Sequence, residues 1–159
     1  MKLTTCLLAA ALPLAACTQP AATTTATAPP ATTAAATFVV GNLAEGDGQI
    51  QGCTTMLSRA GDAPSAGDLF RAGGGDDKDV QGFIRIDGAL ITLNLVTADI
   101  DEKGGRRSFA DTAHTTQVIE SLTTGAAHEE SDSVEESGTL AVTHNGATQT
   151  LQVSGGTAC

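Results

Sequence analysis

Residues 82–96 read GFIRIDGALITLNLV, and this stretch carries the clearest sign of the fold. Its centre, Asp87-Gly88, is a favoured pair for the two-residue type I′ turn that joins antiparallel strands. Folding about this turn places Ile84 opposite Ile91 and collects the apolar side chains on one side. That apolar face consists of Ile84, Ile86, Ala89, Ile91, Leu93 and Leu95. The stretch therefore predicts a β-hairpin with one buried and one exposed face.

A second stretch of the same kind occurs later, where residues 139–153 read TLAVTHNGATQTLQV. Asn145-Gly146 is again a type I′ signal, and it places Leu140 opposite Leu151. The other members of the two faces are Val142 and Val153 on the apolar side and Thr143 and Thr148 on the polar side. Two hairpins with one-sided apolar faces predict an all-β fold, which is a small antiparallel sandwich or barrel.

The rest of residues 38–159 reads as further β structure broken by loops. Weaker strand signals occur at residues 37–40, 50–57, 69–71, 107–110 and 116–122. Residues 73–79 are expected to form a glycine-rich loop, and residues 125–137 a long acidic loop. A stretch of this length suits a single β domain.

The first 17 residues have the layout of an export signal. Lys2 precedes an apolar run at residues 3–14, which is too short to span a bilayer as a permanent helix. The run ends in the motif Leu14-Ala15-Ala16-Cys17, which resembles the signal of bacterial lipoproteins. The resemblance implies removal of a signal peptide at residues 1–16 and lipidation of the Cys17 thiol.

Lipidation at Cys17 would anchor the protein to a membrane of the cell envelope, because two or three acyl chains bind stably. The sorting rules of that family retain a lipoprotein at the inner membrane when Asp follows the cysteine, and here Thr18 follows it. In a Gram-negative host, the resemblance therefore implies the outer membrane, facing the periplasm. Residues 18–37 contain only Thr, Ala, Pro and one Gln. Residues 17–37 are thus expected to form a lipidated, disordered tether, with a glycosylated stalk as the alternative.

The four cysteines of the chain are expected to have different roles. Cys6 would leave with the signal peptide and Cys17 would carry the lipid, which leaves Cys53 and Cys159. In an oxidising compartment such a pair most often forms a disulfide. A bridge from an early strand to Cys159 would close the sandwich or barrel. A redox pair is the less favoured reading, because the chain contains no Cys-x-x-Cys.

The composition narrows the classes of partner. The formal net charge is −10, and this excess of acid repels nucleic acid phosphates and anionic lipid headgroups. The chain has 4 Phe, no Tyr and no Trp, so platforms on which bases or sugars could stack are scarce. We therefore expect no nucleic acid partner. The acidity suits a basic protein partner or cations, and it also suits plain solubility.

Sequence motifs for catalysis or metal binding are missing. His114, His128 and His144 are not at metal-ligand spacing, and His144 is expected to lie in solvent beside the second turn. Asp77 begins an EF-hand-like D-x-D-x-Q-G, but Gly88 stands where a bidentate Glu is required. Neither a G-x-S-x-G elbow nor a phosphate-binding loop occurs. We expect no enzyme activity, no resident metal and no cofactor, while weak Ca²⁺ binding by the acidic loops stays open.

Two resemblances bear on the domain. The first is to a set of small exported bacterial β proteins of no established function. The points of similarity are Gly52-Cys53, Leu69-Phe70, Asp76-Asp77-Lys78, residues 83–88, 93–96 and 150–153, and Cys159. The second is to the membrane-bound inhibitors of c-type lysozyme, which are lipoproteins with a disulfide-closed β-barrel. Residues 99–109 are comparable to the inhibitory loop Ser-x-x-Gly-x-x-Tyr of that family, but they lack its leading Ser and its Tyr.

These features predict an envelope lipoprotein with a non-catalytic β domain that serves as a structural or general interaction module. The alternative is an inhibitor or binder of a basic protein such as c-type lysozyme. A loss of partner binding at high salt would favour the alternative, because salt screens attraction between charged surfaces.

Overall fold

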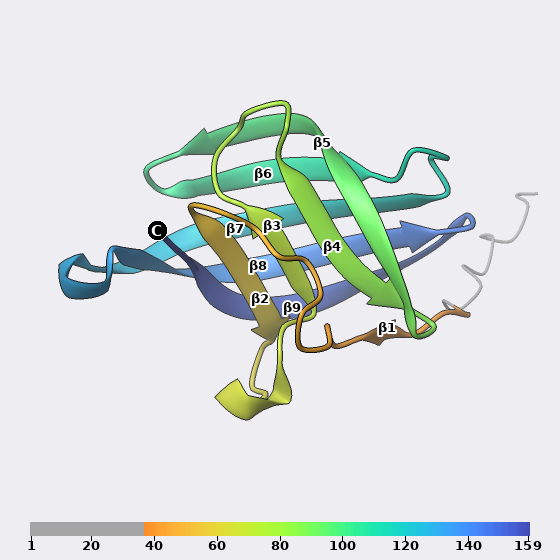
Figure 1. The fold of residues 1–159 in the computed structure, drawn as a ribbon, viewed down its shortest axis with the longest axis horizontal. Coiled ribbons are helices and arrows are strands. Elements are labelled where there is room, and N and C mark those ends of the chain that lie inside the picture. The colour runs from red at the N-terminus through yellow and green to blue at the C-terminus, as the bar shows by residue number, and fades with distance from the viewer. Residues whose placement is uncertain (1–36) are drawn as a thin grey trace, which may run out of the picture. The chain divides into compact units, whose positions relative to one another are not determined.

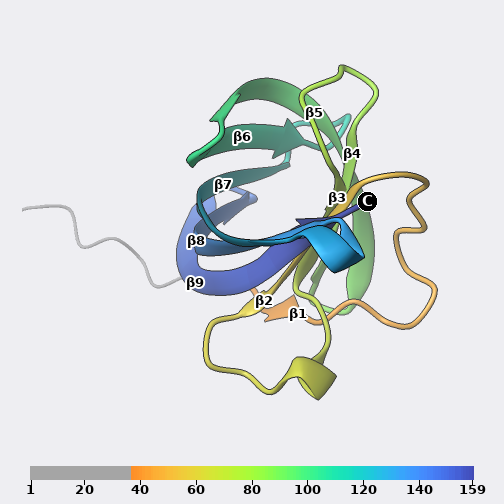
Figure 2. The ribbon, with the colours of Figure 1, turned by 90° about the vertical axis from the view of Figure 1, so that its left-hand side faces the viewer.

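The structure, a computed structural model, describes residues 37–159 (Figures 1 and 2). The expected signal peptide at residues 1–16, the lipid site Cys17 and residues 18–36 of the expected tether lie outside the described residues. The strands are β1 (Val40–Gly41), β2 (Thr54–Arg59), β3 (Phe70–Gly73), β4 (Gln81–Ile86), β5 (Ala89–Asp101), β6 (Gly104–Ala110), β7 (Thr116–His128), β8 (Ser133–His144) and β9 (Ala147–Ala158). Two short 3₁₀ helices, η1 (Pro64–Ala66) and η2 (Glu129–Ser131), lie in connections. No helix in this part of the chain is long and apolar enough to cross a membrane.

Eight of the strands form a closed antiparallel barrel. Their order around the ring is β4-β3-β2-β9-β8-β7-β6-β5, and pairing of β4 with β5 completes it. The short strand β1 pairs with the end of β4, beyond the residues of β4 that contact β3. Figure 2 shows β6 to β9 curving around one side of the barrel, with β3 and β4 on the other. The all-β prediction is confirmed, and of the two expected architectures the structure has the barrel.

Both hairpins have the register expected from the sequence. Ile84 lies opposite Ile91, and Leu140 lies opposite Leu151. All four turn residues have the positive φ that a type I′ turn requires. These angles are 50° at Asp87, 82° at Gly88, 48° at Asn145 and 82° at Gly146. The weaker strands expected from the sequence are also present, with shifted ends.

The prediction of a long acidic loop at residues 125–137 is wrong. Strand β7 continues to His128, η2 forms the turn and β8 begins at Ser133, so this stretch is the outer part of a long hairpin. The first residues of β8 also pair with β9, where Glu135 lies opposite Gly156. Backbone pairing on both sides holds this part of β8 in the sheet although few of its side chains are buried. Strands were predicted from alternating apolar residues. This alternation is weak in residues 125–137, so the sequence pattern predicted a loop there.

Buried apolar side chains fill one end of the barrel interior. The cluster comprises Phe38, Val40, Leu57, Leu69, Phe70, Ala72, Val80, Ile84, Ile86, Leu93, Phe109, Val118, Leu122, Leu140, Val142 and Val153. The rings of Phe70 and Phe109 meet edge to face with their centroids 5.4 Å apart. Gly82 leaves room for this pair, because a Cβ at that position would lie 2.9 Å from the Phe70 ring. The two rings thus require glycine at this point of β4.

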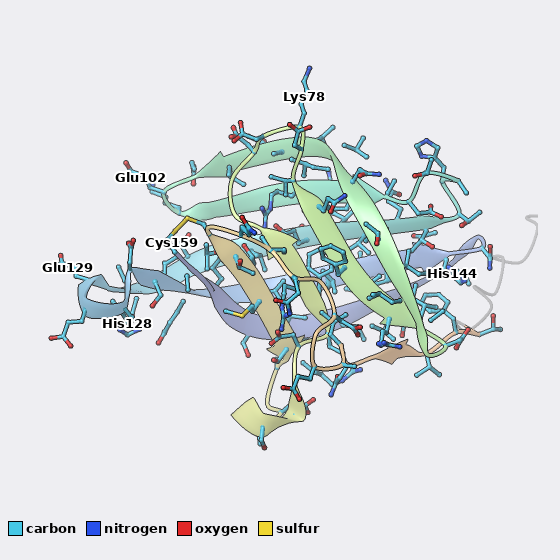
Figure 3. All side chains as sticks on the ribbon, in the orientation of Figure 1. Lys78, Glu102, His128, Glu129, His144 and Cys159 are labelled. Carbon is cyan, nitrogen blue, oxygen red and sulfur yellow. A yellow bond between two sulfur atoms is a disulfide. The ribbon has the colours of Figure 1, made fainter. Side chains whose placement is uncertain are left out.

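A disulfide joins Cys53, just before β2, to Cys159, just after β9 (Figure 3). The two residues are 106 positions apart. Strands β2 and β9 are themselves paired, beginning with Thr54 opposite Ala158. The predicted disulfide is confirmed, and it covalently fixes a seam between early and late parts of the barrel.

Candidate functional site

The inward-facing residues change from apolar to polar along the barrel. On three strands, a buried apolar side chain and a buried polar one stand two positions apart, and therefore on the same face. These pairs are Leu57 and Thr55 on β2, Phe109 and Arg107 on β6, and Val118 and Glu120 on β7. Arg107 and Glu120 are directly opposite each other in the register of β6 and β7. One end of the interior is thus apolar core, and the other end holds buried polar groups.

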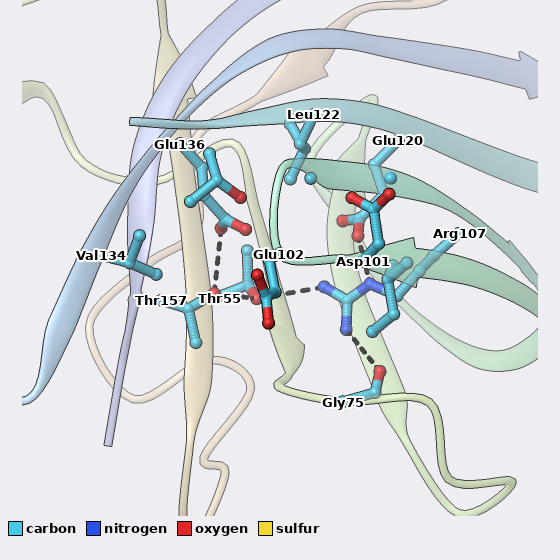
Figure 4. A pocket seen from close by; sticks show the side chains of 14 residues that line it. Thr55, Gly75, Asp101, Glu102, Arg107, Glu120, Leu122, Val134, Glu136 and Thr157 are labelled. Atoms are coloured by element: carbon cyan, nitrogen blue, oxygen red, sulfur yellow. Dashed lines mark hydrogen bonds and ion pairs between the residues drawn. The ribbon is translucent and has the colours of Figure 1, made fainter. Parts of the chain in front are cut away.

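A cavity of about 340 Å³ lies at the polar end (Figure 4). Strands β2 and β5 to β9 all contribute to its wall. Its ionisable lining is Asp101, Glu102, Arg107, Glu120 and Glu136, and its large apolar lining is Ile100, Leu122 and Val134. The volume falls within the range of small-ligand sites, which is roughly 300–1,000 Å³. Four carboxylates against one guanidinium give the cavity a negative potential, which favours a positively charged group.

A buried ion pair forms the inner wall of the cavity. The side chains of Arg107 and Glu120 are only 5% and 3% exposed, and Arg107 Nε donates to Glu120 Oε1. Arg107 Nη1 donates to the carbonyl oxygens of Gly73, at 2.7 Å, and Gly75, at 3.0 Å. Arg107 Nη2 donates to Thr55 Oγ1 at 3.0 Å. The guanidinium therefore joins β6 to β7, to β2, to the end of β3 and to the connection after β3.

A chain of hydroxyl groups leads from this guanidinium to a second carboxylate. Thr157 donates its hydroxyl hydrogen to Glu136 Oε2 at 2.9 Å. The Thr157 oxygen lies 2.7 Å from Thr55 Oγ1, which accepts from Arg107. Because Thr157 has a single hydroxyl hydrogen, Thr55 must be the donor between the two threonines. The donors thus point in one direction, from Arg107 through both threonines to Glu136.

The second carboxylate oxygen of Glu120 has no such partner. Oε2 is buried and forms no hydrogen bond with any group in the described part of the chain. Burial raises the pKa of Glu120, the charge and hydrogen bond of Arg107 oppose that rise, and the charge of Glu136 adds to it. A buried acceptor without a donor costs free energy. Glu120, which lines the cavity, therefore carries a buried acceptor that lacks a donor.

The histidines lie apart from this site. His144 was expected to lie in solvent, and this prediction is wrong. Its Nδ1 is 2.9 Å from Thr116 Oγ1, and the centroid of its ring is 5.6 Å from that of the Phe38 ring. Phe38 comes from a distant part of the sequence, so the local pattern gave no sign of this contact. His128 Nε2 lies 3.1 Å from Glu135 Oε1 at the exposed end of the β7–β8 hairpin. Among residues 37–159, no group of three side chains of the metal-ligating types is placed to hold a metal ion.

Of the two loop-like segments discussed in the sequence analysis, residues 99–109 lie at the cavity and the EF-hand-like segment does not. Residues 99–109 form the end of β5, the following turn and most of β6, so this segment supplies Asp101 and Glu102 to the lining. The EF-hand-like segment that begins at Asp77 starts in the exposed connection between β3 and β4 and continues into β4.

Sequence reasoning missed Arg107 and Glu120 as members of a site. A signal was present, because Val118, Glu120 and Leu122 lie on the same face of β7 and Glu120 is the charged residue among them. A charged residue at an inward position of such a strand requires a buried partner. The sequence did not reveal which strand would supply that partner, since this depends on how the barrel closes.

Comparisons of the chain with protein-family models, curated proteins and solved structures found no match.

Proposed function

We propose that this chain is a lipoprotein of the cell envelope, anchored through Cys17, and that its barrel is a non-catalytic binding module. The acidic cavity is the binding site. The observation that carries this proposal is a cavity lined by four carboxylates and one guanidinium, in which one of the carboxylates, that of Glu120, has a buried oxygen without a donor. A site of this kind attracts a cationic group that can donate a hydrogen bond.

The inner residues of the cavity are suited to holding a ligand rather than to reacting with it. Four hydrogen bonds to protein acceptors fix the Arg107 guanidinium. Glu120 is bound to it through Oε1 and is buried among the strands. A general acid or base must exchange a proton with its substrate, whereas this carboxylate and guanidinium are engaged with each other. The proposal therefore contains no chemical step.

The location in the envelope is proposed from the sequence of residues 14–18, with support from the disulfide. Cys17 stands in the lipoprotein motif, and Thr18 favours the outer membrane in a Gram-negative host. The bond between Cys53 and Cys159 suits an oxidising compartment such as the periplasm, since such bonds are rare in reducing ones.

A second candidate is the binding of a basic protein such as c-type lysozyme. The segment comparable to the inhibitory loop of lysozyme inhibitors ends β5 and begins β6, and it presents the exposed acids Asp101 and Glu102 at the cavity. Acidic side chains at a rim speed association with a basic partner. Tight inhibition requires a few well-buried contacts in addition, and the Ser and Tyr of that loop are missing here.

Site-specific photo-cross-linking in living cells tests the proposed binding site. A photoreactive residue at Glu102, which is exposed and lines the cavity, should capture a ligand or partner. The same residue at Glu130, which is exposed on η2 away from the cavity, should capture nothing comparable. Adding Glu136→Gln to the first variant should reduce the yield. Equal capture at the two positions, or none at Glu102, would contradict the cavity as the binding site.

A further inference from the structure

We infer that the cavity binds a primary ammonium group carried on a short alkyl chain. This inference rests on the proposed function, because it names the class of ligand for the same cavity. The charge of the lining gives the first reason. Asp101, Glu102 and Glu136 have no cation within the cavity other than Arg107, which is already paired with Glu120. A positive ligand would balance part of this excess, whereas an anion would be repelled.

The hydrogen-bonding groups of the cavity require a donor rather than an acceptor. Glu120 Oε2 is an acceptor without a partner, and Glu120 is almost wholly buried. Arg107 uses four of its five N–H groups on oxygens of the protein, so at most one N–H remains to bind an anion. Glu136 accepts from Thr157 through Oε2, and its Oε1 forms no hydrogen bond with the described residues. A ligand with several N–H groups can donate to Glu136 Oε1 and to the other carboxylates that line the cavity.

The distribution of the acids favours an organic cation over a metal ion. A metal ion needs several ligands within about 2–2.6 Å of one point, and the described residues contain no group of three suitable side chains. The acids instead come from separate elements, with Asp101 at the end of β5, Glu120 on β7 and Glu136 on β8. A compact ammonium group directs three N–H bonds outward, whereas a guanidinium requires acceptors in one plane. Acceptors on three strands around the barrel wall fit the ammonium better.

The apolar part of the lining accounts for the alkyl chain. Ile100, Leu122 and Val134 line the same cavity as the carboxylates. Methylene groups placed against these side chains leave water, which favours binding. The lining thus matches a ligand with a charged head and an apolar body. Two kinds of ligand carry such a group. One is a free linear diamine, and the other is the side chain of a lysine in a basic protein.

Calorimetric titration of the full chain in an uncharged detergent tests this inference. The probes are 1,5-diaminopentane for the free amine and N-acetyl-lysine methylamide for the lysyl side chain. The controls are N-acetyl-norleucine methylamide, which has a similar chain without the charge, and the corresponding arginine derivative. At least one amine should bind in a one-to-one ratio, and both controls should bind at least about tenfold more weakly. Binding of only one amine identifies the source, and binding of both supports the shared chemistry.

Matched variants locate the binding. Glu136→Gln keeps an oxygen that can accept from Thr157 and should weaken amine binding about tenfold, since a charged hydrogen bond is lost. Glu130→Gln removes the same charge from η2 and should leave binding unchanged. The inference is overturned if neither amine gives saturable heat up to about 10 mM, if the norleucine or arginine derivative binds equally, or if both variants weaken binding alike. A failed titration with cross-linking still specific to Glu102 would refute the ammonium ligand and leave the proposed function standing.

Discussion

Replacing Arg107 by Met should lower the free energy of unfolding by about 3–5 kcal/mol, because it leaves the buried Glu120 carboxylate without its cation. The side chains of Arg107 and Glu120 are 5% and 3% exposed, so little solvent is available to replace the lost interaction. The variant also removes the donors to Gly73, Gly75 and Thr55. A loss of this size is a large share of the roughly 5–15 kcal/mol that holds a typical domain folded.

The double variant Arg107→Met/Glu120→Leu tests whether the two residues stabilise the fold as a unit. Replacing both charges by apolar groups removes the buried unpaired carboxylate, so the double variant should be more stable than Arg107→Met. If the two residues act together, the two single losses will not add.

The pH dependence gives an independent check. Removing Arg107 removes the groups that lower the pKa of Glu120, so burial should raise that pKa further above its unfolded value. A raised pKa in the folded state favours folding at low pH, and this contribution is lost as the pH rises through the folded pKa. The stability deficit of Arg107→Met relative to the wild type should therefore be smaller at about pH 4 than at about pH 7.

The assay is urea unfolding followed by far-ultraviolet circular dichroism. Intrinsic fluorescence is unsuitable because the chain has no Trp and no Tyr. A change in midpoint at constant slope reports stability. A deficit below about 1 kcal/mol, or one that is the same at both pH values, would refute the view that the ion pair is a buried charged unit.

Four further predictions test other parts of the molecule. Labelled fatty acid should enter the wild-type chain and not Cys17→Ser, and equal labelling of both would contradict lipidation at this residue. Thiol counting on denatured, unreduced protein should find neither Cys53 nor Cys159 free, and loss of their bridge should lower the free energy of unfolding by about 2–5 kcal/mol. Two reactive thiols in material from an oxidising compartment would overturn the bridge. Gly82→Ala should cost about 1–3 kcal/mol in urea unfolding because its methyl group would lie 2.9 Å from the Phe70 ring, and an unchanged midpoint would show that the ring moves freely. The purified protein at micromolar concentration should inhibit lysozyme weakly at most in a turbidity assay at about 0.15 M salt, whereas stoichiometric inhibition would favour the second candidate function.

The hairpins were predictable because their signals are local. A type I′ turn at Asp87-Gly88 fixes the register, and the two-residue period of the strands then decides which side chains face inward. The disulfide was predictable from counting, because the predicted fates of Cys6 and Cys17 left only Cys53 and Cys159. Both predictions needed no information about which strands become neighbours across the barrel.

The cavity was not predictable for the opposite reason. Arg107 and Glu120 become a buried pair only when β6 and β7 pair and the connection after β3 approaches Arg107. The same limit explains the errors at His144 and at residues 125–137. Phe38 covers His144, and β9 supports the start of β8, in contacts between distant parts of the sequence.

The seam between β2 and β9 has a consequence for the timing of folding. On the ribosome, β2 emerges long before β9, and the barrel cannot become a ring until β9 is available to pair with it. Pairing between such distant segments makes folding slow. The barrel therefore stays open until β9 has been made. The disulfide between Cys53 and Cys159 can form only after β9 has been made, and it then holds the two sides of this seam together.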